Sequence, residues 1–212
     1  MLTRIGVTGG IASGKSEACQ QLKALGAEVL SADIIARQLT DTNPTIRKKI
    51  ASLFGQGAYD DPSGLLIREF VAEQVFADPK RLQSLNAIVH PAVLERIDVE
   101  LQAIEMKTSA RYVAIEAALM FESGLNKKVD YVLAVLADEA VRISRSQIKN
   151  TLTEEQTRLR MELQISSEEI IERSDFVLYN NDSMDAFKKK VAFFHALFMT
   201  LKPRPEKDND KN

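Results

Sequence analysis

The sequence is poor in the residues that build disulfide frameworks and metal centres. It contains one cysteine, Cys19, and two histidines, His90 and His195, among 212 residues. A single cysteine cannot form an internal disulfide, and a zinc site needs several thiolate or imidazole ligands close together. We therefore expect neither an internal disulfide nor a structural metal site, and we expect Cys19 to be a buried helix residue.

The sequence also lacks an excess of charge of either sign. Lys and Arg number 28 and Asp and Glu number 30, which gives a net charge of −2 and a pI near 5.8. A protein that holds a nucleic-acid backbone usually carries a basic excess. The composition therefore argues against a nucleic-acid partner.

Long hydrophobic runs are absent as well. No stretch approaches the ~18–20 consecutive apolar residues that span a bilayer. The N-terminus shows no basic segment followed by a small-residue cleavage site, so it does not resemble a secretion signal. Hydrophobic residues still make up 45% of the chain and charged residues 27%, as in soluble globular domains. We expect a cytoplasmic protein with no membrane partner.

The apolar pattern predicts an α/β protein. Short β-rich segments typical of buried strands occur at 4–7, 28–30, 112–117, 131–136 and 176–179. The first is followed by a glycine-rich turn, a helical spacing over 15–25 and then the second strand. This order is the βαβ pattern of a parallel sheet, so we predict a parallel sheet of five strands.

Two helical regions interrupt the predicted sheet. Residues 34–107 contain no convincing strand, and residues 138–173 are polar and rich in Arg, Glu and Gln. Prolines divide the first region into expected helices at 34–40, 44–54, 64–77, 79–88 and 91–107. An amphipathic helix is expected at 184–201, followed by a tail, 202–212, with almost no apolar residue. We expect this tail to be disordered.

This pattern gives a single domain over residues 1–201. Its core would consist of residues 1–33, 108–137 and 174–201, with 34–107 as a helical insertion and 138–173 as a helical flap.

The strongest motif is G-x-x-x-x-G-K-[ST] at residues 9–16, here called the phosphate loop. Its glycines let several backbone N–H groups point at one phosphate, and the following helix presents its positive end there. Lys15 adds a positive charge for the outer phosphates, and the Ser16 hydroxyl can ligate Mg²⁺. The motif predicts a nucleotide held by its phosphates together with Mg²⁺. The residues expected to hold it are Gly10, Ile11, Ala12, Ser13, Gly14, Lys15, Ser16 and Glu17.

GTP-driven switches use the same loop, together with D-x-x-G after a strand and N-K-x-D to read guanine. Asp61–Gly64 spells D-x-x-G but follows no buried strand. Asn126–Asp130 has one residue too many for N-K-x-D and precedes a strand, whereas a base-reading motif would follow one. A small-molecule or nucleotide kinase is therefore favoured over a switch.

A kinase also needs a group that orients or deprotonates the acceptor hydroxyl. Asp33 follows the second predicted strand, at the sheet edge where open α/β folds bind ligands. The same residue could instead be the N-cap of the helix that begins at Ile34. Position alone leaves both roles open.

These segments resemble the dephospho-coenzyme A kinase family in order and in detail. Thr8–Ser16 resembles the family's T-G-G-I-x-S-G-K-S, and Ala32–Arg37 is similar to its A-D-x-I-A-R. Gly64–Arg68 resembles G-x-x-x-R, Leu85–Pro91 resembles L-N-x-I-x-H-P, and Asp175–Asn180 completes the order. The resemblance runs from Arg4 to about Asn181, essentially the whole predicted fold.

The resemblance implies a P-loop NTPase-type three-layer fold, with 34–107 binding the acceptor and 138–173 closing over ATP as a lid. It implies ATP-dependent phosphorylation of the ribose 3′-hydroxyl of dephospho-CoA, the last step of coenzyme A biosynthesis, with ATP and Mg²⁺. A nucleoside or nucleoside-monophosphate kinase is the alternative, and a GTP- or ATP-gated switch a weaker one. Dephospho-CoA would be the partner of a monomer or weak homo-oligomer.

The resemblance also implies roles for single residues. Asp33 would be the base, and the acceptor would lie near Arg37, Gly64, Arg68 and His90. His90 could equally be a core histidine at a His-Pro step. Glu116 and Glu122 could hold Mg²⁺ through water or cap the sheet edge.

The sequence also departs from the family in places. Lys149 aligns with the family's lid arginine but lacks its forked geometry, so Arg145 or Arg142 could supply the contact to the transferring phosphate instead. Ser31 stands where the family often has a further Asp.

Overall fold

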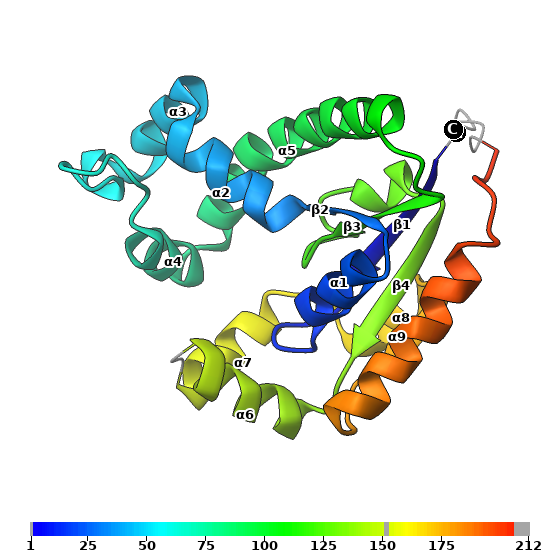
Figure 1. Ribbon diagram of the computed structural model, residues 1–212. Helices are drawn as coiled ribbons and strands as arrows, with labels where there is room; N and C mark the ends of the chain where they lie inside the picture. Colours follow the sequence, from blue (N-terminus) through cyan, green and yellow to red (C-terminus); the bar gives the residue numbers. More distant parts are fainter. Residues whose placement is uncertain (1, 151–152, 206–212) are drawn as a thin grey trace, which may run out of the picture. The chain divides into compact units, whose positions relative to one another are not determined.

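The structure is a computed structural model that describes residues 2–150 and 153–205, without the side chains of residues 149 and 150 (Figure 1). The chain forms two compact units. The sheet unit comprises residues 1–30 and 103–212, and the helical unit comprises residues 31–102. The predicted insertion, 34–107, therefore corresponds to the helical unit, but its C-terminal end belongs to the sheet unit. There the backbone N–H of Leu2 donates to the Glu105 carboxylate at 3.4 Å.

Five strands form the sheet, as predicted. They are β1 (Thr3–Thr8), β2 (Glu28–Ser31), β3 (Tyr112–Glu116), β4 (Tyr131–Leu136) and β5 (Phe176–Tyr179). Their order is β2-β3-β1-β4-β5, and β1 runs parallel to both β3 and β4, as β4 does to β5. Because parallel strands end at one edge, this order brings the ends of β1, β3, β4 and β5 together.

Helices α1 (Lys15–Ala24) and α9 (Met184–Phe198) pack on one face of this sheet (Figure 1). Ile5 and Val7 of β1 alternate with residues of the opposite face and share a core with Leu22 and Phe187. On the other face, Gly6 leaves room for Met120, whose Cε lies 2.9 Å from the place a Cβ would occupy. Helices therefore cover one face of a parallel sheet whose interior is apolar, and the predicted α/β class is confirmed.

The segment 138–173, expected as one polar helical region, forms three helices of the sheet unit. They are α6 (Glu139–Asn150), α7 (Glu154–Glu162) and α8 (Ser167–Glu172). Helix α7 begins with a capping box, in which Thr153 and Gln156 bond to each other's backbone N–H groups. Ser166 is the N-cap of helix α8, and its side chain accepts from Glu169 N.

The helical unit has a core of its own. Its helices are α2 (Ala32–Thr42), α3 (Pro44–Phe54), η1 (Gln56–Ala58), α4 (Arg68–Ala77) and the first part of α5 (Pro79–Lys107). The buried core residues are Ile46, Ile50, Phe54, Ala58, Val71 and Val75.

Two boundary predictions in this unit are wrong. The helix expected at 64–77 begins only at Arg68, because residues 60–67 form a turn closed by an antiparallel bridge between Tyr59 and Leu66. The helices expected at 79–88 and 91–107 are one helix, α5, which continues through Pro91. Proline removes one backbone hydrogen bond, and burial of Ile97 and Leu101 after it stabilises the helix by packing.

The part of the predicted disordered tail that the structure describes is packed against the sheet unit. The Arg204 guanidinium contacts the Asp175 carboxylate at 2.6 Å and lies 4.1 Å from the centre of the Tyr131 ring. The Tyr131 hydroxyl donates to the Lys202 carbonyl at 3.2 Å. The expectation of disorder is therefore wrong for 202–205, where these charged and aromatic partners fix the chain. Residues 206–212 lie outside the described part.

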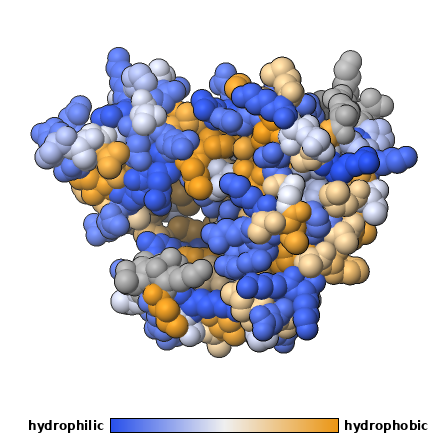
Figure 2. Space-filling view, viewed as in Figure 1, coloured by the Kyte–Doolittle hydropathy of each residue, from blue (hydrophilic) through white to orange (hydrophobic). Residues whose placement is uncertain are grey.

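On the displayed face, hydrophilic residues predominate and hydrophobic ones are scattered among them (Figure 2). Among residues 2–150 and 153–205, no helix combines the length and the apolar character that crossing a membrane requires.

Candidate active site

The phosphate loop joins the end of β1 to the start of α1, the context that its motif requires. Gly9 has φ 146° and Gly14 has φ 105°, which are left-handed values that favour glycine. A Cβ on Gly9 would lie 2.0 Å from the Val135 carbonyl oxygen, and one on Gly14 would lie 2.2 Å from Asn180 Nδ2. Both glycines are therefore needed because β4 and the end of β5 approach the loop so closely.

Lys15 and Ser16 begin α1 beneath this loop. Lys15 is only 8% exposed, and its Nζ donates to the Gly10 carbonyl at 3.0 Å. The Ser16 hydroxyl donates to Glu116 Oε1 at 2.5 Å, where Glu116 is the last residue of β3. A hydroxyl and a carboxylate oxygen in contact are ligands that suit Mg²⁺. Of the two carboxylates considered from the sequence, Glu116 and Glu122, it is Glu116 that contacts Ser16.

Cys19 and Glu17 lie on the same helix. Burial, followed by the negative charge of Glu116, raises the pKa of the Cys19 thiol, which keeps it protonated and unreactive. The Glu17 carboxylate accepts from Gln21 Nε2 at 2.8 Å, one turn further along α1.

Two side chains from the segment 138–173 hold the backbone of Ile11. Arg142 of α6 donates from Nε to the Ile11 carbonyl at 3.2 Å, and the Gln164 side chain accepts from the Ile11 N–H at 2.9 Å. The Arg142 guanidinium also covers Gly10, where a Cβ would lie 2.8 Å from it. Burial lowers the pKa of Arg142, partly offset by Glu139. A partly desolvated positive charge therefore lies against the loop.

Asn180 connects the loop to α6. Its Nδ2 donates to the Ser13 carbonyl at 2.9 Å, and its Oδ1 accepts from Arg145 at 3.4 Å. Within the described part of the chain, Arg145 Nη1, Ser13 Oγ and Ser146 Oγ are buried and have no hydrogen-bond partner. Buried polar groups are normally satisfied, so unpaired donors around a phosphate loop point to an anionic ligand.

Asp33 lies in the helical unit and is not the N-cap of α2. That position belongs to Ser31, whose side chain accepts from Ile34 N at 3.4 Å. The capping interpretation of Asp33 is therefore wrong. The Asp33 side chain is exposed in the first turn of α2. The N-cap role belongs to Ser31, the residue that departs from the family pattern.

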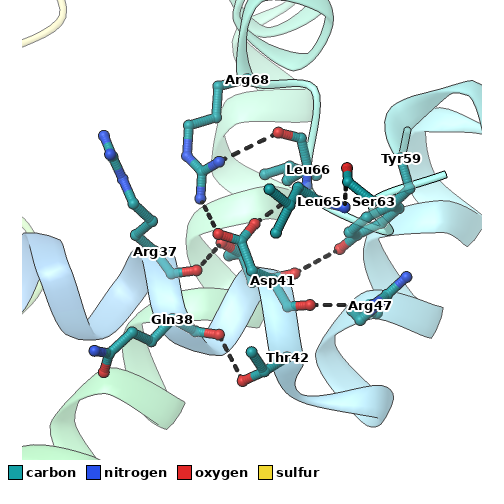
Figure 3. Close-up of polar contacts among 11 residues, drawn as sticks. Arg37, Gln38, Asp41, Thr42, Arg47, Tyr59, Ser63, Leu65, Leu66 and Arg68 are labelled. Atoms are coloured by element: carbon teal, nitrogen blue, oxygen red, sulfur yellow. Dashed lines mark hydrogen bonds and ion pairs between the residues drawn. The ribbon is translucent and has the colours of Figure 1, made fainter. Parts of the chain in front are cut away.

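The other residues predicted on the acceptor side also lie in the helical unit. Arg37 is exposed on α2, and Arg68 begins α4 and is paired with Asp41 (Figure 3). Gly64 has φ 66° in the 60–67 turn, where a side chain would be strained. His90 is partly buried in the middle of α5.

Lys149 belongs to α6, but its side chain lies outside the described part of the chain. Sequence reasoning assigned no role to Asp41, Gln164 or Asn180. Asn180 could have been suspected because it follows a strand end at the ligand-binding edge. Gln164 belongs to the stretch that resembles the family, but the sequence did not indicate its contact with Ile11, since 153 residues separate the two.

Comparison with known proteins identifies the family. Residues 3–186 match the family model described as dephospho-CoA kinase. The chain belongs to the dephospho-CoA kinase family. A dephospho-CoA kinase from Salinibacter ruber is 39% identical over 194 residues, which cover 90% of this chain and 95% of that protein. The predicted family is thereby confirmed.

Solved structures share the fold of this dephospho-CoA kinase family member. A protein from Thermus thermophilus is 30% identical with a TM-score of 0.78, over 95% of this chain and 99% of that one. The dephospho-CoA kinase from Campylobacter jejuni is 26% identical with a TM-score of 0.67, over 92% and 96% of the two chains. The predicted P-loop kinase fold is confirmed.

Proposed function

We propose that the protein transfers the γ-phosphoryl group of ATP to the ribose 3′-hydroxyl of dephospho-CoA, giving coenzyme A and ADP. The observation that carries this proposal is the family match over residues 3–186, in a chain whose phosphate loop has its strand and helix in place. The reaction would complete coenzyme A biosynthesis. The enzyme would act in the cytoplasm as a monomer or weak homo-oligomer.

The sheet unit would bind the donor. The N–H groups of Gly10–Ser16 and the start of α1 would surround the β- and γ-phosphates, with Glu17 at the edge of the set. Lys15 would leave the Gly10 carbonyl to contact the outer phosphates. Phosphoryl transfer depends mostly on positioning and charge neutralisation. The buried ammonium of Lys15 would serve both purposes.

Ser16 and Glu116 would hold the metal that such kinases use. Their contacting oxygens form a hard donor set that fits Mg²⁺, with the hydroxyl as a direct ligand and the carboxylate beside it. Bound there, Mg²⁺ would neutralise phosphate charge. The Glu116 carboxylate also orients the Ser16 hydroxyl.

The helical unit would bind the acceptor. Asp33 would accept the proton of the ribose 3′-hydroxyl, and its exposure at the start of α2 leaves the carboxylate accessible. Arg37 and Arg68 would bind the anionic part of dephospho-CoA, and Gly64 and His90 would line the same site.

The lid would complete the site from α6. Lys149, by its alignment, and Arg145, by its forked geometry, are the candidates to stabilise the transferring phosphate. Arg145 has a buried unpaired Nη1 and is held by Asn180 near the loop. Arg142 contacts the loop directly and is the third candidate.

A coupled ADP-release assay with several acceptors tests the proposal. We expect turnover with dephospho-CoA and only background ADP release with adenosine, CMP, UMP or shikimate. The product should elute with coenzyme A, and not with an isomer phosphorylated at another hydroxyl. Turnover with a nucleoside monophosphate but not with dephospho-CoA would replace this function by a nucleoside-monophosphate kinase.

A further inference from the structure

Helix α2 carries a stripe of charged residues that the family motif only partly covers. Asp33, Arg37 and Asp41 are each four residues apart, so they lie along one side of the helix. Asp33 and Arg37 are exposed, whereas the Asp41 side chain is only 12% exposed. The Asp41 end of this stripe is therefore mostly buried within the helical unit.

Both oxygens of the Asp41 carboxylate are engaged (Figure 3). Oδ1 accepts from the Leu66 N–H at 3.1 Å, and Oδ2 accepts from Arg68 Nη2 at 2.8 Å. Arg68 also donates from Nη1 to the Leu66 carbonyl at 3.2 Å. Two contacts therefore fix the orientation of the Arg68 guanidinium, while its 35% exposure leaves part of it accessible.

The surroundings of Asp41 are mostly cationic. Arg47 donates to the Asp41 carbonyl at 3.1 Å and lies 4.8 Å from the centre of the Tyr59 ring. Burial raises the pKa of Asp41, but the bonds from Arg68 and Leu66 outweigh it, and the charge of Arg37 adds to them. The pKa ends below its usual value, so Asp41 is ionised at neutral pH.

The Asp41 carboxylate thus bonds to Arg68 and also lies within the electrostatic influence of Arg37. Guanidinium groups bind phosphate oxygens through paired N–H donors. Dephospho-CoA carries a diphosphate in the middle of the molecule, between its ribose and its pantetheine arm. A base at Asp33, with Arg37 one turn further along α2 and Arg68 at the start of α4, matches a hydroxyl and a diphosphate on one acceptor.

We propose that Asp41 is a positioning residue that holds Arg68 beside Arg37, so that the two guanidinium groups receive the diphosphate of the acceptor. This inference rests on the proposed function and adds the part of the substrate that the Asp41–Arg68 pair recognises. Asp41 acts through Arg68 and does not touch the reacting atoms.

Asp41→Asn is the central test, because it keeps the shape and removes the charge that fixes Arg68. We expect the KM for dephospho-CoA to rise about tenfold, in line with the loss of one charged hydrogen bond. The KM for ATP and kcat should stay close to wild type, and the melting temperature should fall only modestly, since one partly buried charged hydrogen bond is lost. Asp61→Asn, an exposed carboxylate on the same turn, is the matched control and should change none of these values.

Two further variants separate positioning from simple folding. Asp41→Glu should recover part of the acceptor affinity because it restores the charge. Asp41→Asn combined with Arg68→Ala should be no worse than Arg68→Ala alone, since the first residue acts through the second.

An Asp41→Asn enzyme with an unchanged KM for dephospho-CoA would overturn the inference, and so would one in which both KM values rise while kcat and stability fall. Wild-type enzyme inactive on dephospho-CoA would instead overturn the proposed function.

Discussion

Among single residues, Lys15 is a positive charge that the fold buries at the phosphate loop. A buried ammonium is unfavourable unless it is paired, and here the Gly10 carbonyl accepts from it at 3.0 Å. The carbonyl is a weaker partner than a phosphate, because bonds to ionised acceptors are about twice as strong as those to neutral ones. A nucleotide would therefore draw Lys15 away from the loop backbone.

Lys15→Ala should strongly slow phosphoryl transfer while the protein stays folded. An oriented donor of this kind contributes about 3–4 kcal/mol to the transition state, so kcat should fall roughly 10²–10³-fold. Lys23→Ala, at the exposed far end of the same helix, is the control and should be fully active. Steady-state kinetics and thermal unfolding of both variants measure the difference. Near-normal turnover of Lys15→Ala would contradict the phosphate-loop assignment.

Asp33 and Ser31 allow catalysis and helix capping to be separated. Because Ser31 caps α2, Asp33→Asn should remove the base, lowering kcat roughly 10²–10⁴-fold. The lost interaction with the helix dipole should reduce stability by less than ~1 kcal/mol. Ser31→Ala should do the opposite, reducing stability by ~1 kcal/mol and leaving kcat largely intact. Melting temperatures and kcat values for both variants decide the matter, and an active Asp33→Asn enzyme would exclude the base role.

Helices and strands differ in how far the sequence predicts them. The strands were located to within one or two residues, because short β-rich apolar runs such as 131–136 have few other interpretations. The sequence predicts a break in α5 at Pro91, because proline disfavours a helix interior. The tertiary packing that keeps α5 continuous is not visible in the local sequence. The turn at 60–67 was missed because its bridge between Tyr59 and Leu66 is a pairing that helical spacing does not show.

In the candidate site, too, local features could be predicted from the sequence and long-range contacts could not. The phosphate loop is a contiguous motif, so its place between β1 and α1 could be predicted. The contacts of Ile11 with Arg142 and Gln164 join segments that only the folded sheet brings together. The pairing of Asp41 with Arg68 likewise depends on the 60–67 turn, whose conformation the sequence pattern did not reveal.

Helices α6 and α7, which we propose as a lid, should be the least protected elements of the sheet unit. In α7, Thr157 is the one residue that the structure shows buried, and Arg158 pairs with Glu154 and Glu139 at the surface. Exposed pairs contribute only about 0–1 kcal/mol each, and elements with few buried contacts open readily. We predict fast amide hydrogen exchange in α6 and α7 without ligands.

Binding of ATP and dephospho-CoA together should slow this exchange, because kinases close such lids to exclude water. Strand β4 serves as the internal control and should be protected in both states, since five of its six residues are buried. Slow exchange in α6 and α7 that ligands do not change would indicate a rigid helical pair and remove the lid hypothesis.

For the whole molecule, stability at alkaline pH depends on groups buried in the sheet-unit core. Burial raises the pKa of Cys19 and of Tyr112, and the Tyr112 hydroxyl is hydrogen-bonded to His195 Nδ1 at 2.9 Å. Both groups are neutral in the folded and unfolded chain below their ordinary pKa values of about 8.5 and 10. Above those values the unfolded chain loses protons that the folded chain keeps, so the free energy of unfolding falls as pH rises.

The thiol part of this dependence can be isolated because Cys19 is the only cysteine. Between pH 8.5 and 10 a single such group contributes a slope approaching 1.4 kcal/mol per pH unit. Cys19→Ala should be less stable at pH 7, since it leaves a small cavity beside α1, but its stability should fall less steeply over this range. Denaturant unfolding of both proteins from pH 7 to pH 10 measures the two slopes. Parallel curves would mean that the thiol ionises as readily in the folded protein as in the unfolded chain, in spite of its burial between α1 and the sheet.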